Sequence, residues 1–160
     1  MNNSDLASFG PGSVIGILGG GQLGRMTALA AARLGYRCHI FAPEAGGPAA
    51  QVTDAETVSG YDDQSALARF ADMIDVATYE FENVPVESVD FLLERIPVHP
   101  GPKALAAAQD RLVEKNFLRS IDIPTAPFLE ANDAAALGRA VAELGHPAVL
   151  KTARLGYDGK

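Results

Sequence analysis

The sequence has very little cysteine, and its histidines do not cluster, which limits the chemistry that the chain can carry. Cys38 is the only cysteine among 160 residues, so no internal disulfide can form and no thiolate metal site can be built. The three histidines, His39, His99 and His146, lie far apart in the sequence. We therefore predict no metal ligands in this chain, and we expect Cys38 to be a buried strand thiol in a reducing compartment.

Basic clusters and long apolar runs are also missing. The chain has 13 lysine and arginine residues against 20 acidic ones and a formal net charge of −7, and its basic residues are scattered singly. Because a protein that binds nucleic acid relies on a basic patch, we expect no nucleic-acid partner. No apolar run approaches the roughly 20 residues that span a bilayer, and the first twelve residues lack the parts of a secretion signal. We therefore expect a cytoplasmic protein without a membrane partner.

The first hundred residues alternate between apolar runs and helical patterns, and 48% hydrophobic residues suffice for a core. Strands are predicted at 13–18, 36–42, 55–58 and 74–81. Helices are predicted at 22–35, 63–73 and 85–96, with Asp63 as a cap of the second. The first of these helices places apolar residues at helical spacing: Leu23, Met26, Leu29, Ala30 and Leu34. This alternation predicts an α/β fold with a doubly wound parallel sheet.

The pattern changes after Pro102. Residues 103–121 are predicted as helix with a break near Gln109, 122–131 as an extended stretch, 133–145 as an amphipathic helix and 146–153 as a strand. We therefore divide the chain into a Rossmann-like domain at 1–102, a connecting helical segment at 103–123 and the beginning of a second domain at 124–160. The sequence stops at Lys160 in a glycine-containing loop, so we expect a truncated chain.

The stretch GGGQLG at 19–24 follows a predicted strand and begins a predicted helix. Glycines there permit a tight turn, and the free N–H groups of the helix start attract an anion. A dinucleotide site also needs an acid about 20 residues further on. Glu44 has that spacing, but it follows Pro43, and Ala42 takes the diagnostic place. Three interpretations stay open from these residues: a dinucleotide site, a site for a smaller anion, and a purely structural turn.

Two carboxylates, Glu80 and Glu82, follow the predicted strand at 74–81 in TYEFENVP. Strand alternation would point both side chains to one face. Ligands of open α/β sheets bind at the carboxyl ends of the strands, where the glycine turn also lies. The carboxylates could therefore accept hydrogen bonds from ribose hydroxyls or from an amine. The alternative is that they are solvated loop charges.

The stretch AVLKTARLGYDGK combines a lysine with a glycine loop. Lys151 follows three apolar residues, so we expect a packed stem and an ammonium group held at a fixed point. Gly156 and Gly159 flank Tyr157 and Asp158 a few residues later. A fixed lysine beside a glycine loop can bind polyphosphate, because the lysine neutralises charge while backbone N–H groups cover the phosphoryl group. The alternative is an exposed charge at the end of a strand.

Six motifs, in this order, resemble the N5-carboxyaminoimidazole ribonucleotide synthetases, which are ATP-grasp ligases of de novo purine biosynthesis. They are GGGQLGRM, TYEFENVP, QDRLVEK, IPTAPF, PAVLKT and GYDGK. The resemblance runs from about Val14 to Lys160. It implies a pre-ATP-grasp domain followed by the start of an ATP-grasp domain. It also implies a ligase that uses Mg-ATP and bicarbonate to form carboxyphosphate, and then carboxylates aminoimidazole ribonucleotide with release of ADP and phosphate.

The resemblance also implies roles for particular residues. Arg111 and Lys151 would contact the phosphates of ATP. The loop over the triphosphate would begin with Gly156, Tyr157, Asp158, Gly159 and Lys160. The catalytic residues would be Lys151, Tyr157 and Asp158. Gln22, Leu23 and Glu80 would form the ribonucleotide site, with Glu82 as a second candidate. The glycine turn would receive the 5′-phosphate side of that substrate. Ala153 and Leu155 stand where relatives often have arginine and glycine.

The same resemblance places the magnesium ligands beyond the end of this chain, so we expect the chain alone to be inactive. The resemblance also implies that the intact enzyme is a homodimer. Two other functions stay open. One is an NAD(P)-binding domain of an oxidoreductase, with Glu44 on the ribose. The other is a non-catalytic nucleotide-binding module.

Overall fold

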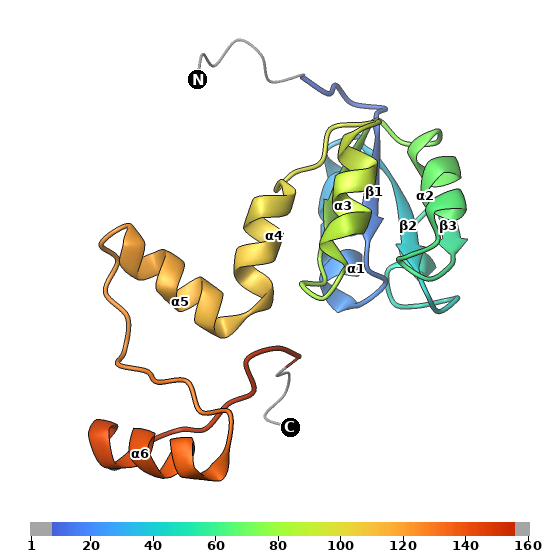
Figure 1. The fold of residues 1–160 in the computed structure, drawn as a ribbon. Coiled ribbons are helices and arrows are strands. Elements are labelled where there is room, and N and C mark those ends of the chain that lie inside the picture. The colour runs from blue at the N-terminus through green and yellow to red at the C-terminus, as the bar shows by residue number, and fades with distance from the viewer. Residues whose placement is uncertain (1–7, 156–160) are drawn as a thin grey trace. The chain divides into compact units, whose positions relative to one another are not determined.

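The computed structural model describes residues 8–155 of the chain; residues 1–7 and 156–160 lie outside the described part (Figure 1). The chain divides into two compact units, 1–105 and 106–160. The domain boundaries predicted from the sequence at 102 and 123 stay a prediction.

The first unit contains a parallel sheet of four strands in the order β3-β2-β1-β4. The strands are β1 (Val14–Leu18), β2 (Arg37–Ala42), β3 (Ala55–Val58) and β4 (Val76–Tyr79). Both neighbours of β1 run parallel to it, with Ile17 opposite Ile40 on one side and Thr78 on the other. Non-sequential neighbours of this kind require crossover connections, and the predicted α/β fold with a parallel sheet is confirmed.

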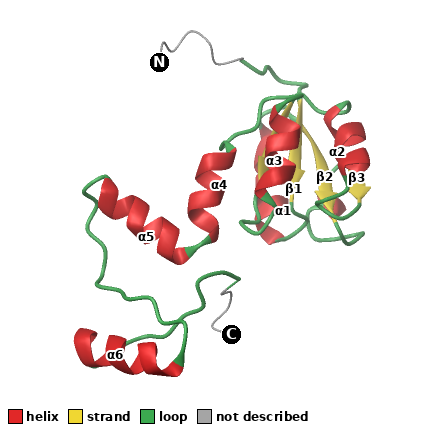
Figure 2. Ribbon diagram, viewed as in Figure 1, coloured by secondary structure: helices red, strands yellow, loops and turns green. Residues whose placement is uncertain are grey.

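Helices cover both faces of this sheet (Figure 2). One face packs against α1 (Gln22–Arg33) and the short η1 (Ala50–Val52), around a cluster that includes Ile17, Cys38 and Ile40. The other face packs against α2 (Gln64–Ala71) and α3 (Val86–Leu93), around a larger cluster that contains Phe41 and Phe70. Alternation along the strands sends successive side chains to the two clusters, which is the arrangement of a doubly wound sheet.

The orientation of α1 differs from the sequence prediction. The residues that face the sheet are small, namely Gly24, Ala28 and Ala31, whereas Leu23 and Met26 are 53% and 65% exposed. Leu29 and Leu34 are exposed as well. The reason is a close approach at the start of the helix, since a Cβ atom on Gly24 would lie 3.0 Å from the Gly19 carbonyl oxygen and 3.2 Å from the Ala49 Cβ atom. The large apolar face that the spacing suggested therefore points away from the core.

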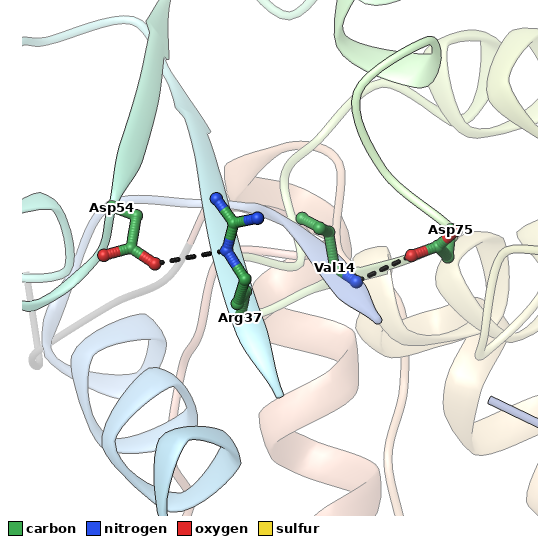
Figure 3. Close-up of polar contacts among 4 residues, drawn as sticks. All are labelled: Val14, Arg37, Asp54 and Asp75. Atoms are coloured by element: carbon green, nitrogen blue, oxygen red, sulfur yellow. Dashed lines mark hydrogen bonds and ion pairs between the residues drawn. The ribbon is translucent and has the colours of Figure 1, made fainter. Parts of the chain in front are cut away.

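Side-chain contacts tie together the amino ends of the strands (Figure 3). The backbone N–H of Val14, at the start of β1, donates to the Asp75 carboxylate at 2.7 Å, and the Asp75 N–H donates to the Val14 carbonyl at 2.9 Å. Arg37, at the start of β2, pairs with Asp54 at 3.4 Å. Both members of this ion pair are exposed, so it contributes little stability. These contacts link the starts of β1 and β2 to the residues that precede β4 and β3.

Two further local predictions are confirmed. Asp63 caps α2 by accepting a hydrogen bond from the Ala66 N–H, and this bond, together with one from the Ser59 hydroxyl, lowers the pKa of the Asp63 carboxyl. Cys38 is buried within β2. Burial, and to a smaller extent the charge of Asp54, raise the pKa of its thiol.

The second unit contains helices joined by extended segments. Helix α4 (Pro102–Gln109) spans the boundary between the units, and α5 (Arg111–Ser120) and α6 (Ala134–Leu144) follow. The predicted break near Gln109 is confirmed. It arises because Asp110 leaves the helical conformation and caps α5, accepting hydrogen bonds from the N–H groups of Leu112 and Val113. Between residues 8 and 155, no helix is long and apolar enough to cross a membrane.

The predicted strand at 146–153 was wrong. These residues form no strand, and Val149 and Leu150 are 79% and 71% exposed. An extended segment becomes a strand only when a neighbour pairs with its backbone. Among the described residues no strand lies beside this segment. The apolar run in the sequence therefore does not produce a strand by itself.

Candidate functional site

The glycine turn connects β1 to α1 at the carboxyl edge of the sheet. Gly19 has a φ of +123°, which favours glycine, and a Cβ atom there would lie 2.5 Å from the Glu80 Oε1 atom. The Gly21 N–H donates to Glu80 Oε1 at 2.9 Å. Sequence reasoning placed the turn and Glu80 at one edge, and the structure brings them into direct contact. The absence of side chains in the turn is what admits the carboxylate.

A second segment closes the other side of the turn. The Ala49 N–H donates to the Gly20 carbonyl at 3.0 Å, and a Cβ atom on Gly47 would lie only 2.7 Å from that oxygen. Arg25 of α1 holds this loop by donating to the Pro48 carbonyl at 3.1 Å and to the Gln51 side chain at 3.0 Å. The backbone of the turn is therefore engaged on both sides by the protein itself.

This packing bears on the three interpretations of the turn. A dinucleotide cradle needs open backbone N–H groups for the pyrophosphate, but the Gly21 N–H already binds the Glu80 carboxylate. A phosphate placed there would also meet the negative charge of Glu80. The Glu80 contact therefore weighs against a dinucleotide at the Gly21 N–H, and the expectation that the turn receives the 5′-phosphate side of a substrate stays a prediction. Glu44, the acid of the dinucleotide interpretation, lies exposed in the loop after β2.

The two carboxylates after β4 have different surroundings. The strand ends at Tyr79, so strand alternation does not extend to Glu82, and the expectation that both side chains share one face loses its basis. Glu80 is half-buried against the glycine turn, whereas Glu82 lies in the turn that leads to α3. Gln22 and Leu23 are the first residues of α1, and both are exposed. Of these candidates, Glu80 is the one that the fold holds in place.

Tyr61 is a neighbour of Glu80 that the sequence did not reveal. Its ring stacks on Phe41 with the centroids 6.1 Å apart and lies 6.4 Å from the Phe81 ring. Burial, and then the charge of Glu80, raise the pKa of the Tyr61 phenol to about 12. The phenol therefore stays protonated at neutral pH as a hydrogen-bond donor. The available signal was its position three residues after β3, at the same edge of the sheet.

In the second unit, the fold brings the Lys151 segment to the start of α5. The Arg111 N–H donates to the Ala153 carbonyl at 2.9 Å, so the first residue of α5 contacts a residue two positions after Lys151. The Arg154 guanidinium also donates to the Gln109 side-chain oxygen at 3.0 Å. Two of the candidate phosphate-binding residues, separated by forty positions of sequence, therefore belong to one local arrangement.

The surroundings of Lys151 differ from the expectation. We expected a packed stem, but Lys151 is exposed and lies outside any strand, because the preceding apolar residues have no neighbours to pack against in the described part of the chain. The candidate residues Gly156, Tyr157, Asp158, Gly159 and Lys160 lie outside the described residues. From residue 8 to residue 155, no group of three or more His, Cys, Asp or Glu side chains could hold a metal ion.

Comparison with protein-family models assigns the class of protein. Residues 13–109 match the ribonucleotide synthetase preATP-grasp domain, and residues 116–160 match the ATP-grasp domain. The chain therefore belongs to the ribonucleotide synthetase preATP-grasp family. The fold class and the family resemblance predicted from the motifs are confirmed.

Individual relatives refine this assignment. The chain is 54% identical to the N5-carboxyaminoimidazole ribonucleotide synthase of Brucella melitensis over 98% of its own length and 43% of that protein. Its structure resembles the ADP complex of N5-carboxyaminoimidazole ribonucleotide synthetase, with a TM-score of 0.89, 43% identity, and coverage of 95% of this chain and 40% of that one. It also resembles the Aspergillus clavatus synthase in complex with ADP and 5-aminoimidazole ribonucleotide (TM-score 0.79, 30% identity, coverage 91% and 39%). The chain spans about two fifths of these relatives.

Proposed function

We propose that this chain is part of an ATP-dependent ligase that carboxylates aminoimidazole ribonucleotide in purine biosynthesis. In this reaction a bicarbonate oxygen attacks the γ-phosphorus of ATP, which yields carboxyphosphate and ADP. The exocyclic amine of the ribonucleotide then attacks the carboxyl carbon, forms a C–N bond and loses a proton as phosphate leaves. The support is the family membership together with relatives that are described as synthases of this product.

The single observation within the chain that carries the proposal is the contact between the start of α5 and the Lys151 segment. The hydrogen bond from the Arg111 N–H to the Ala153 carbonyl fixes two cationic residues in one local region. Arginine guanidinium and lysine ammonium groups are the usual partners of phosphate oxygens. We assign both to the ATP phosphates and Lys151 to the γ-phosphoryl group as it transfers. Gly156, Tyr157, Asp158, Gly159 and Lys160 remain candidates for the loop that covers it.

Glu80 is our candidate for recognition of the ribonucleotide. Its Oε1 atom is held by the Gly21 N–H, so the remaining lone pairs of the carboxylate are free to accept hydrogen bonds from a ligand. Ribose hydroxyls and an exocyclic amine carry the hydrogens that such an acceptor needs, and a phosphate does not. Gln22 and Leu23 directly follow Gly21 at the start of α1 and are further candidates, and Glu82 is a second candidate carboxylate.

Magnesium would accompany ATP and neutralise phosphate charge. The described residues do not supply a cluster of ligands for it, so we derive no step from them that involves the metal. We further propose a cytoplasmic, homodimeric intact enzyme, on the basis of the resemblance alone.

The proposal is tested by replacing Lys151 in the full-length gene product that carries this chain. We expect Lys151→Ala to lower phosphate release, measured with ATP, bicarbonate and aminoimidazole ribonucleotide, by about 100-fold or more, because a charge that stabilises the transferring phosphoryl group is lost. Lys103→Ala, an exposed lysine at the start of α4, serves as the matched control and should retain activity. Unchanged turnover in Lys151→Ala would contradict the assignment.

The NAD(P)-binding alternative makes a different prediction. It requires NADH to bind the same protein, and a fluorescence titration would detect this. Because the Gly21 N–H is occupied by Glu80, we expect no saturable binding of NADH. A non-catalytic module would bind nucleotide but release no phosphate in the assay above.

A further inference from the structure

We infer that Gln109 and Arg154 are a positioning pair for the nucleotide site, which they serve without touching the nucleotide. This inference rests on the proposed function, because it assigns a purpose to residues next to Arg111 and Lys151. Both residues belong to the second unit. The pair fixes where the Lys151 segment lies relative to the start of α5.

The attachment has two points on neighbouring residues. Arg154 Nη2 donates to Gln109 Oε1 at 3.0 Å, across 45 positions of sequence. On the adjacent residue, the Ala153 carbonyl accepts from the Arg111 N–H at 2.9 Å. One hydrogen bond alone would allow the segment to rotate about it. Two bonds from consecutive residues set both the position and the direction of the backbone at 153–154.

Burial makes the Gln109 contact specific. Gln109 is one of three buried polar residues among those described, with 8% of its surface exposed. A buried amide oxygen must keep a hydrogen-bond partner, because leaving it unpaired forfeits its hydration without compensation. The guanidinium of Arg154 supplies a charged donor, which strengthens the bond. The side chain at 109 is therefore held by the fold, and Arg154 is attached to a fixed point.

Within the described residues, the segment before the pair is neither buried nor paired as a strand. Val149 and Leu150 are exposed, and residues 146–153 form no strand. Leu155, immediately after the pair, has a φ of +57° although it is not a glycine. Its side chain is also exposed, so packing of that side chain does not select this disfavoured conformation. The chain therefore turns sharply at the residue where the two-point attachment ends.

The consequence for function is geometric. Arg111 and Lys151 must reach neighbouring oxygens of one triphosphate, and a shift of about 1 Å in such groups can cost about 100-fold in rate. The pair presets their separation before the nucleotide arrives. Weakening the pair should therefore weaken the use of ATP, while the ribonucleotide site at Glu80 keeps its own contacts.

The experiment uses the full-length gene product and three variants. Gln109→Leu removes the acceptor and keeps the approximate volume, Gln109→Glu keeps an acceptor oxygen, and Arg154→Met removes the donor from an exposed position. We expect Gln109→Leu and Arg154→Met each to raise the KM for ATP about tenfold, because each removes the hydrogen bond that positions the Lys151 segment. The KM for aminoimidazole ribonucleotide should stay within about twofold of the unmodified protein, and Gln109→Glu should restore the KM for ATP.

Limited proteolysis tests the attachment independently of catalysis. In the absence of nucleotide, trypsin should cleave after Arg154 about tenfold faster in Gln109→Leu than in the unmodified protein, because the guanidinium is released. Gln109→Glu should return the rate to its original value. In Arg154→Met, cleavage after Lys151 provides the same measurement. If Gln109→Leu does not fold, the exposed Arg154→Met variant decides the question.

The outcomes separate this inference from the proposed function. If cleavage accelerates and the KM for ATP does not change, the pair is a structural anchor and the positioning role is wrong. If neither changes, the attachment itself is wrong. If the unmodified protein releases no phosphate from ATP, the proposed function fails and the positioning role fails with it, whereas the proteolysis result still decides whether the anchor exists.

Discussion

Residues 8–105 build two apolar clusters, one on each face of the sheet, whereas the helices in residues 106–155 contribute almost no buried apolar side chains. In the first unit Leu18, Phe41 and Phe70 are fully buried within one cluster. Among the described residues of the second unit, Ala140 is the only buried apolar side chain. Phe117 and Leu129 remain exposed there. Packing therefore stabilises the first unit, and other forces hold the helices of the second.

Those other forces are local. Asp110 and Asp133 cap α5 and α6 by accepting hydrogen bonds from backbone N–H groups in the first turn. Phe128 lies under the side chains of Lys115 and Arg119, 5.1 Å from the ammonium nitrogen and 4.0 Å from the guanidinium carbon. Contacts of this size bias a helix but do not replace a core, because short helices are marginal in water without tertiary packing.

The largest expected effect comes from separating the two units. A chain of residues 1–109 keeps Leu105 and all four strands, and we expect it to unfold cooperatively in urea with a free energy of about 5 kcal/mol or more. A peptide of residues 110–160 should show no cooperative transition by circular dichroism. A sigmoidal urea transition in that peptide would show that it has a core of its own and would remove the contrast between the units.

Matched phenylalanines test the same contrast within one chain. Phe70 is fully buried and packs edge-to-face against His39 and Phe41, with ring centroids 5.0 Å and 5.2 Å apart. We expect Phe70→Ala to lower the free energy of unfolding by about 3–5 kcal/mol. Phe117→Ala, at a site that is 51% exposed, should change it by less than about 0.5 kcal/mol. Equal effects in chemical denaturation would mean that α5 packs in solution against something that it does not contact here.

The sequence pattern predicted those features of the fold that depend on short-range interactions. The Asp63 cap, the break after Gln109 and the run of β1 each depend on residues that are close in the chain. The shared edge of the glycine turn and Glu80 also followed, because the topology of a parallel sheet brings those loops together.

The remaining features depend on partners that a sequence pattern does not identify. The helical spacing in α1 was detected, but the face that packs inward was decided by the close approach at Gly24 to Gly19 and Ala49. The run at 146–153 has the composition of a strand and no neighbour to pair with. Gln109 and Arg154 lie 45 positions apart, and nothing in either motif indicates that they meet.

Glycines distinguish the tightly packed region from the open one. Gly19 needs a positive φ, and its Cβ atom would collide with Glu80, so we expect Gly19→Ala to destabilise the protein by about 1–3 kcal/mol. Gly138 lies in α6 with no atom within 4 Å of an added Cβ atom. Gly138→Ala should stabilise α6 by about 0.5–1 kcal/mol, because alanine loses less backbone entropy. Thermal unfolding of both variants would measure whether each substitution raises or lowers the stability. A destabilising Gly138→Ala would contradict the open surroundings of α6.

The smallest expected effect is a pH dependence that belongs to the first unit. His39 of β2 is buried, its Nε2 atom lies 2.8 Å from the Thr57 hydroxyl, and burial lowers its pKa below the ordinary 6.5. As the pH falls below about 6.5, the unfolded chain binds a proton that the folded chain does not bind, so the free energy of unfolding decreases. We expect His39→Leu to flatten this decrease between pH 6.5 and 5 in urea titrations. His146→Gln, at an exposed position in the second unit, should leave it in place. A slope that survives in His39→Leu would assign the acid sensitivity to other groups, and the core around Phe70 would then tolerate a charged imidazole.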